Sequence, residues 1–297
     1  MNVFLPADIL IPDVESMEKW SVIACDQFSS QPEYWKDVKE TVGYAPSSFH
    51  LIFPEAELEN VDENEKIKTI NWNMQSYLEQ GIFQKYEKSY VYVERTLKNG
   101  SIRRGLVGMI DLEAYDYSEN SSSRIRATEK TVTCRIPPRV RIREDAPVEL
   151  PHVLLLCDDR SDGLMEWLSG KKEEMRKIYN FNLMKEGGHI SGWLVSGKLA
   201  KDFEKKITSY ENISAEMPYA VGDGNHSLAT AKVCYENYKK THSDTENANA
   251  PARYAMVELE NIHDKALEFS PIHRIVTETD EEALLDELQK TCCAPEG

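Results

Sequence analysis

Residues 219–238 read YAVGDGNHSLATAKVCYENY, and this stretch predicts the central element of the fold. A short apolar run at residues 219–221 meets a polar turn at residues 222–227. From Leu228 onward, apolar residues recur about every 3.6 positions, which is typical of a helix with one buried face. A strand, a glycine turn and a helix in this order direct backbone N–H groups and the positive end of the helix dipole to one point.

The polar turn carries the residue types of a binding site. Gly222 and Gly224 allow the backbone to approach a ligand closely, and Asp223 and His226 place titratable groups beside it. The spacing fits neither a Walker A loop, because no Lys follows the second glycine, nor the G-x-G-x-x-G fingerprint. We therefore expect an anion or nucleotide site at this turn. The alternative is a helix cap with a buried histidine.

The same turn resembles the Asp-Gly-His-His-Arg-Tyr signature of an uncharacterised prokaryotic family, domain of unknown function family 1015. That signature is similar to the phosphate-binding loop of the ParB/sulfiredoxin-like group, which includes free-serine kinases. Asp223, Gly224 and His226 match the signature, and Asn225 stands in the place of its first His. Ser227 stands in the place of its Arg, which removes a bidentate partner for phosphate.

A second stretch resembles this family. Residues 128–131 read TEKT, and the family carries His-Glu-x-Thr at the corresponding place. Glu129 matches this pattern, whereas Thr128 replaces the His. Phosphoryl transfer to a hydroxyl needs a carboxylate that orients the acceptor and takes its proton, and the resemblance gives Glu129 that role. The alternative for Glu129 is a solvated side chain in a charged stretch.

Two more landmarks supply the remaining candidates. Residues 271–274 read PIHR where the family has Pro-Thr-His-Arg, so His273 and Arg274 are expected to supply the positive charge that Ser227 lacks. The alternative is a salt bridge between this pair and one of the many acids. Asp26 ends an apolar run in the place of a family Tyr-Asp, and the alternative for it is a turn cap.

The composition is that of a soluble globular protein with an acidic surface. Of the 297 residues, 41% are hydrophobic, and the formal net charge is −16. Binding along a nucleic-acid backbone needs clustered Lys and Arg, so this charge argues against nucleic acid as a partner. We expect no signal peptide and no membrane span, because no apolar run approaches about 18 residues. The six dispersed cysteines favour a reduced, cytoplasmic setting without disulfides.

Hairpins alternate with helices, which predicts an α+β fold with a mixed, largely antiparallel sheet and flanking helices. The clearest hairpin joins residues 89–97 and 102–112 through Asn99 and Gly100, and a second joins residues 181–185 and 189–195. We further expect helices at residues 32–42, 62–80, 163–179, 198–208 and 280–290, strands at 49–53, 152–157, 253–259 and 269–276, and loops at 116–126 and 241–251. The resemblance adds a ParB/sulfiredoxin-like phosphate-loop core.

No internal repeat and no linker is visible in the sequence. Residues 1–297 are therefore expected to form a single compact unit, with the option of two lobes around the glycine loop. Members of the resembled family usually continue well beyond this length. The resemblance thus implies either a chain truncated at its C-terminus or a short member.

Three functions fit these residues. The first is nucleotide-dependent phosphoryl transfer to a small hydroxyl-bearing metabolite, with ATP or another nucleotide and Mg²⁺ as cofactors. The second is a ligand-binding or regulatory module that uses the same loop without turnover, which the loss of the motif Arg favours. The third is a metal-dependent hydrolase built on Asp223 and His226. The candidate catalytic residues are Glu129, Asp223 and His226, and the candidate ligand-binding residues are Gly222, Gly224, Asn225, Ser227, His273, Arg274 and Asp26. We expect Glu129, Asp223, His226 and Arg274 to converge.

Overall fold

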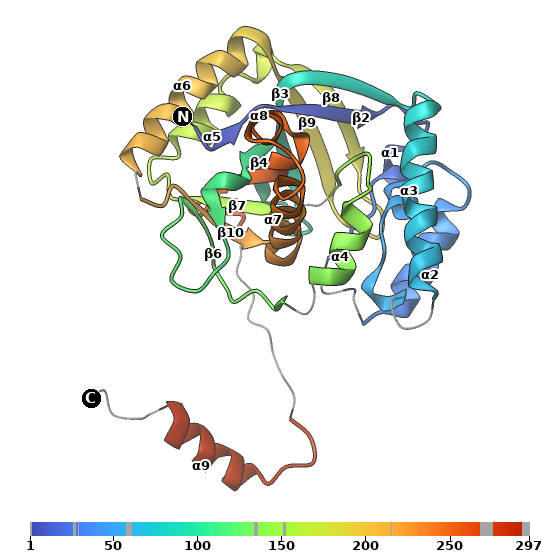
Figure 1. Ribbon diagram of the computed structural model, residues 1–297, viewed down its shortest axis with the longest axis vertical. Coiled ribbons are helices and arrows are strands. Elements are labelled where there is room, and N and C mark those ends of the chain that lie inside the picture. The colour runs from blue at the N-terminus through green and yellow to red at the C-terminus, as the bar shows by residue number, and fades with distance from the viewer. Residues whose placement is uncertain are drawn as a thin grey trace. The chain divides into compact units, whose positions relative to one another are not determined.

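The computed structural model describes residues 2–25, 28, 30–57, 61–133, 136–150, 153–214, 216–267 and 276–292. The chain forms two units, residues 1–267 and residues 268–297. The first unit contains a large sheet with its helices (Figure 1). The second contains helix α9 (Glu281–Cys292), close to the expected helix at residues 280–290.

The strands of the first unit join into one sheet. Their bounds are β1 (Phe4–Leu5), β2 (Ala7–Pro12), β3 (Phe83–Thr96), β4 (Ile102–Asp111), β5 (Tyr115–Asp116), β6 (Ile125–Ala127), β7 (Leu154–Cys157), β8 (Arg176–Asn182), β9 (His189–Val195), β10 (Tyr219–Asp223) and β11 (Tyr254–Asn261). The order is β5-β6-β10-β7-β11-β4-β3-β9-β8, with β1 paired to β4 and β2 to β3. Three neighbouring pairs are parallel, namely β5 with β6, β6 with β10 and β7 with β11, and the other described pairs are antiparallel. The predicted mixed, largely antiparallel sheet is confirmed.

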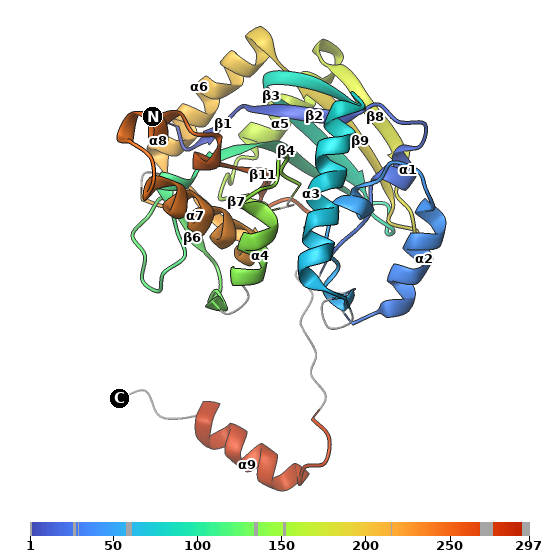
Figure 2. The same ribbon diagram turned by 45° about the vertical axis from the view of Figure 1, so that its right-hand side comes forward.

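Helices flank this sheet, as an α+β fold requires. The α-helices are α1 (Met17–Trp20), α2 (Pro32–Val42), α3 (Glu63–Glu79), α4 (Ile136–Arg143), α5 (Gly163–Ser169), α6 (Gly197–Ile213), α7 (Asn225–Lys239) and α8 (Asp244–Asn249), and the 3₁₀ helices are η2 (Ser48–Leu51), η3 (Glu55–Glu57), η4 (Leu112–Ala114), η6 (Lys172–Glu174) and η7 (Pro251–Arg253). Helix α4 lies between α7 and α3 in both views (Figures 1 and 2). Within the described residues, no helix has the length and apolar content needed to cross a bilayer.

The side chains of β3 alternate between the two faces of the sheet, and both faces are packed around this strand. Successive side chains of a strand point to opposite faces. Tyr90 and Tyr92 lie in the main core, together with apolar residues of α5, α6 and α7. Val91 and Val93 lie in a second cluster on the other face, which includes residues of β2. The sheet is therefore buried on both faces around β3.

Several predicted elements are confirmed and three are wrong. Helices α2 and α3 and the hairpin of β3 and β4 lie where the sequence predicts them. The expected strand at residues 49–53 is instead the 3₁₀ helix η2. The cause is the Ser47 side chain, which accepts the Phe49 N–H at 3.1 Å and donates to the Lys19 carbonyl at 2.6 Å. These contacts bend the chain before it can extend.

Of the other two wrong predictions, the first is explained by a tertiary contact and the second by a local capping signal. The expected helix at residues 163–179 ends at Ser169, because the following residues from Arg176 pair with β9 as strand β8. The expected loop at residues 241–251 contains helix α8. Its start is a capping box, in which Ser243 and Glu246 bond reciprocally to each other's backbone N–H. The sequence Ser-x-x-Glu carries this signal. Helices α1 and α4 and strands β1, β2, β5 and β6 were not predicted, and β6 begins inside the loop expected at residues 116–126.

A buried carboxylate fixes the N-terminal strand to the core. Glu211 of α6 is 2% exposed and accepts backbone N–H groups of Val3 and Phe4 at 3.0 to 3.1 Å. The Tyr219 hydroxyl donates to the same carboxylate at 3.1 Å, and Arg124 pairs with it at 3.2 Å. Burial raises the pKa of Tyr219 well above its ordinary value, so its hydroxyl remains a donor. Glu211 therefore joins β1, α6 and β10.

We expect Glu211→Gln to lower the free energy of unfolding by about 3 kcal/mol, because the change leaves buried donors with a poorer acceptor and removes the partner of Arg124. Glu204→Gln on the same helix is the control and should change stability by less than about 0.5 kcal/mol. Urea denaturation followed by circular dichroism measures both. Equal stability of the two variants would show that Glu211 does not anchor the strand.

Candidate functional site

The candidate site begins with the parallel pairing of β6 and β10. Tyr219 lies opposite Ile125, and Val221 lies opposite Ala127. Because the two strands are parallel neighbours, the residues that follow them leave the sheet at the same edge. In open α/β sheets, ligands bind outside the carboxyl ends of the parallel strands. Residues 128–132, here called the 128–132 segment, therefore lie beside the turn that joins β10 to α7.

Three hydrogen bonds connect the 128–132 segment to this turn. The Thr128 hydroxyl donates to the Val221 carbonyl at 2.6 Å. The Asn225 side-chain amide donates to Glu129 Oε1 at 3.1 Å. The Val132 N–H donates to His226 Nε2 at 3.2 Å. The segment is thus held at its start, middle and end against the last residues of β10 and the first residues of α7.

Both glycines of the turn have structural roles. A Cβ atom on Gly222 would lie 2.8 Å from two side-chain carbons of Leu156 on the neighbouring strand β7, so a larger residue would displace that side chain. Gly224 has φ of +85°, a conformation that L-residues with a side chain rarely adopt. The fold therefore accounts for both glycines, and neither alone indicates a ligand.

The turn leaves the N-terminus of α7 without a side-chain cap. Gly224 is the N-cap residue, and because glycine has no side chain it makes no side-chain cap hydrogen bond. Asp223 is exposed, and its Oδ1 accepts the N–H of Gly224 at 2.7 Å. A helix N-terminus of this kind attracts anions through its N–H groups and its dipole. The 15-residue length of α7 is enough for a full dipole.

Two carboxylates and two cations lie on the turn or on the strand and segment beside it. Glu129 and Asp223 are exposed carboxylates. The nearby Lys130 pairs with Glu119 at 2.7 Å, and Arg126 donates to the Ser123 carbonyl at 2.8 Å. Neither cation therefore has its charge directed at the turn. A ligand with several negative charges would meet repulsion from the two carboxylates unless a cation accompanied it.

His226 acts as an acceptor in this arrangement. Because its Nε2 accepts the N–H of Val132, that nitrogen carries no proton and the ring proton is assigned to Nδ1. The imidazole therefore fixes the position of Val132. A role for Nε2 as a proton acceptor would require this contact to open.

A metal at this turn would need ligand oxygens in addition to those of the protein. Among the described residues, no group of three or more His, Cys, Asp or Glu side chains is arranged to hold a metal ion. Mg²⁺ usually binds through one or two carboxylates together with substrate phosphates. The exposed carboxylate of Asp223 fits that pattern.

The structure brings Glu129 next to the turn that contains Asp223 and His226. It also shows contacts that the sequence reasoning missed, namely those of Thr128 and Val132. The TEKT landmark pointed to the first of these residues, whereas a backbone N–H leaves no sequence signal. Asp26, His273 and Arg274 lie outside the described residues, as does most of the strand expected at residues 269–276. Cys25, Cys157 and Cys234 are free cysteines, and the side chains of the other three cysteines are outside the part of the chain that the structure describes.

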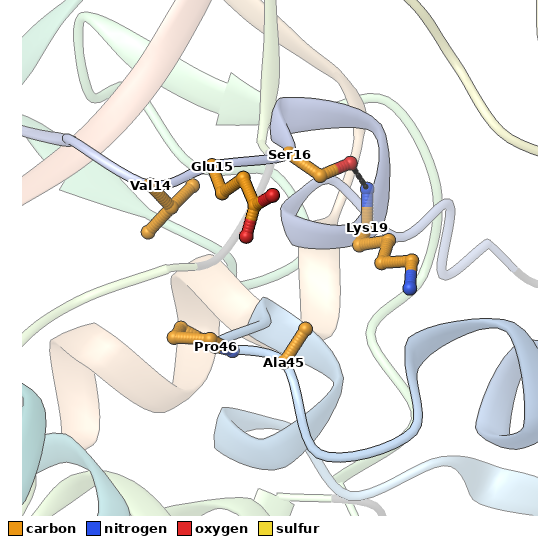
Figure 3. Close-up of a pocket in the computed structure, with 6 residues that line it drawn as sticks. All are labelled: Val14, Glu15, Ser16, Lys19, Ala45 and Pro46. Atoms are coloured by element: carbon orange, nitrogen blue, oxygen red, sulfur yellow. Dashed lines mark hydrogen bonds between the residues drawn. The ribbon is translucent and has the colours of Figure 1, made fainter.

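Two surface pockets lie at other positions of the first unit. One has a volume of about 340 Å³ and is lined by Val14, Glu15, Ser16, Lys19, Ala45 and Pro46 (Figure 3). Its Ser16 side chain accepts the N–H of Lys19 at 3.3 Å, so that hydroxyl is used in capping α1. The other, of about 610 Å³, is formed by the β3–β4 and β8–β9 turns. Neither pocket is lined by a candidate site residue.

Comparisons with known proteins identify a family and no function. A family model described as "Protein of unknown function (DUF1015)" matches residues 9–294. A search of curated proteins returned no match, and a search of solved structures returned none either. The match covers both the 128–132 segment and the β10–α7 turn, so both parts of the candidate site belong to the region that defines the family.

We expect Thr128→Val to lower the free energy of unfolding by about 1 kcal/mol, because it removes the hydroxyl that bonds the Val221 carbonyl. Thr133→Val, an exposed position just after the segment, should have less than half this effect. Chemical denaturation measures both changes. If the two variants are equally stable, the Thr128 contact does not hold the segment.

Proposed function

Because the chain belongs to the family described as protein of unknown function (DUF1015), which carries no assigned activity, we propose a function from the site itself. We propose that the protein binds a nucleotide at the β10–α7 turn and transfers a phosphoryl group to a small hydroxyl-bearing metabolite. The observation that supports this most is the contact between Asn225 and Glu129, at 3.1 Å. It sets a carboxylate beside an uncapped helix N-terminus.

The phosphates would bind at the start of α7. The N–H groups of the first turn and the helix dipole attract them, and Ser227 adds a hydroxyl from that turn. This strand–turn–helix arrangement is what a ParB/sulfiredoxin-like phosphate-loop core would have, and that finer assignment of the fold is part of the proposal. His273 and Arg274 remain proposed sources of positive charge.

Asp223 and Glu129 would have separate roles. Asp223 would hold Mg²⁺ together with the phosphates, and the ion would neutralise the charge of the transferred group. Glu129 would orient the acceptor hydroxyl and take its proton, since its exposed side chain is open to a small molecule. Phosphoryl transfer depends chiefly on such positioning and charge stabilisation, so few protein groups are required.

A second candidate function is ligand binding without turnover. It is favoured by the His226 contact, because Nε2 already accepts the Val132 N–H and is not available to a substrate proton. The serine in place of the motif arginine favours it as well. In this function the same turn would bind the nucleotide, and the 128–132 segment would report its presence to a partner.

We expect at least one nucleotide among ATP, ADP and CTP to raise the melting temperature in the presence of Mg²⁺. Ligand that binds only the native state stabilises it by about 2.7 kcal/mol at a concentration of 100 times Kd. Differential scanning fluorimetry with and without Mg²⁺ measures the change. No shift with any nucleotide would contradict both candidate functions.

Catalytic turnover of ATP distinguishes phosphoryl transfer from ligand binding alone. With ATP and Mg²⁺ supplied, we expect ADP release that depends on an added hydroxyl compound, tested with L-serine, L-threonine and glycerol. Glu129→Gln should lower this rate by about 100-fold, the lower end of the contribution of a general base, while the nucleotide-induced shift in melting temperature persists. Lys130→Gln is the neighbouring control. Binding without acceptor-dependent ADP release would select the second candidate.

A further inference from the structure

Glu129 lies next to the first residue of α7, beside the helix N-terminus at which the proposed function places an anionic ligand. Gly224 provides no side-chain cap for α7, and the first residue of the helix, Asn225, donates its side-chain amide to Glu129 Oε1 at 3.1 Å. A carboxylate is favourable near a helix N-terminus, because it faces the positive end of the dipole. In this state a carboxylate from a segment 96 residues earlier in the chain is therefore held beside the first residue of the helix.

In this state, two buried polar atoms have no hydrogen-bond partner in the part of the chain that the structure describes, so a rearranged state could form hydrogen bonds that this one lacks. Asn225 is 2% exposed, and its Oδ1 has no hydrogen-bond partner within the described residues. Thr131, 6% exposed, has a hydroxyl that likewise finds no partner there. Buried polar groups are normally paired, and an unpaired one destabilises the state that contains it. Asn225 makes the contact with Glu129, and Thr131 lies in the same 128–132 segment as Glu129, so a rearrangement of this segment by a ligand would allow both atoms to find partners.

The local charge determines which ligand can cause that rearrangement. A free polyphosphate would have to replace the Glu129 carboxylate while Asp223, also exposed, remains close to it. The neighbouring Lys130 pairs with Glu119 in this state. A divalent cation changes the balance, because it attracts the carboxylates and the phosphates at the same time.

We propose that Glu129 is a specificity-determining residue, which excludes free anions from the α7 N-terminus and admits the magnesium complex of a polyphosphate. This inference rests on the proposed function, whose binding site it refines. When the complex binds, Glu129 leaves Asn225 and turns to the metal or to the acceptor hydroxyl. The Asn225 amide then donates to a phosphate oxygen. Glu129 thus closes the site in the free protein and contacts the metal or the acceptor hydroxyl in the ligand-bound protein.

The test measures the binding of pyrophosphate by isothermal titration calorimetry, once with EDTA and once with excess Mg²⁺. The proteins are the wild type, Glu129→Gln and Glu173→Gln, an exposed glutamate of η6 that serves as the control of equal charge change. We expect the wild type to bind magnesium pyrophosphate and to bind free pyrophosphate weakly. Glu129→Gln should bind free pyrophosphate at least about tenfold more tightly than the wild type, a change of ~1.4 kcal/mol. Glu173→Gln should match the wild type.

Each other outcome counts against the inference. If Glu129→Gln and the wild type bind free pyrophosphate equally, Glu129 does not exclude anions, and the proposed nucleotide site still stands. If neither protein binds pyrophosphate in either form, both the inference and the proposed site are rejected. A gain shared by Glu173→Gln would assign the effect to net charge alone. Glu129→Ala is measured in parallel, and its unfolding curve and that of Glu129→Gln establish that the variants are folded.

Discussion

The parallel pairing of β6 with β10 is the constraint on which the candidate site depends. β6 has three residues, yet its register with β10 decides that the 128–132 segment lies beside the β10–α7 turn. β7, the other neighbour of β10, is antiparallel to it, so the chain after β7 leaves at the opposite edge. The two segments that carry chemistry therefore meet at one edge of the sheet, although about a hundred residues separate them.

Two glutamates show how differently the fold uses the same side chain. Glu211 is buried and receives backbone N–H groups, a tyrosine hydroxyl and an arginine, so its charge is satisfied and its position is fixed. Glu129 is exposed and has one described partner, the Asn225 amide. A charge held by many donors stabilises structure, whereas a charge held by a single donor at the surface can exchange partners at low cost. This contrast is the reason to assign anchoring to Glu211 and ligand response to Glu129.

Local signals in the sequence predicted local structure well. The strand–turn–helix at residues 219–238, the Asn99-Gly100 hairpin, and helices α2 and α3 each follow from periodicity, caps or turn residues.

The wrong predictions arise where residues distant in the sequence determine the local structure. Residues 49–53 have the composition of a strand, but Ser47 bonds the carbonyl of Lys19 and forces a 3₁₀ turn. Residues 176–179 continue the predicted helical pattern, but they pair with β9 as part of the sheet. The site was predictable as a turn with Asp223 and His226, and Glu129 was added by the family pattern. No local rule could have predicted the bonds of Thr128 and Val132 to that turn.

We propose above that a magnesium–nucleotide complex binds at the N-terminus of α7 and that Glu129 then leaves Asn225. Backbone amide shifts in a ¹⁵N-labelled sample, followed during a titration with ATP and Mg²⁺, test this claim most directly. We expect the largest changes at the backbone amides of Gly224, Asn225 and Ser227, accompanied by a change at the amide of Glu129 as its side chain leaves Asn225. Changes confined to the pocket around Ser16 and Lys19, or no saturable change at all, would contradict it.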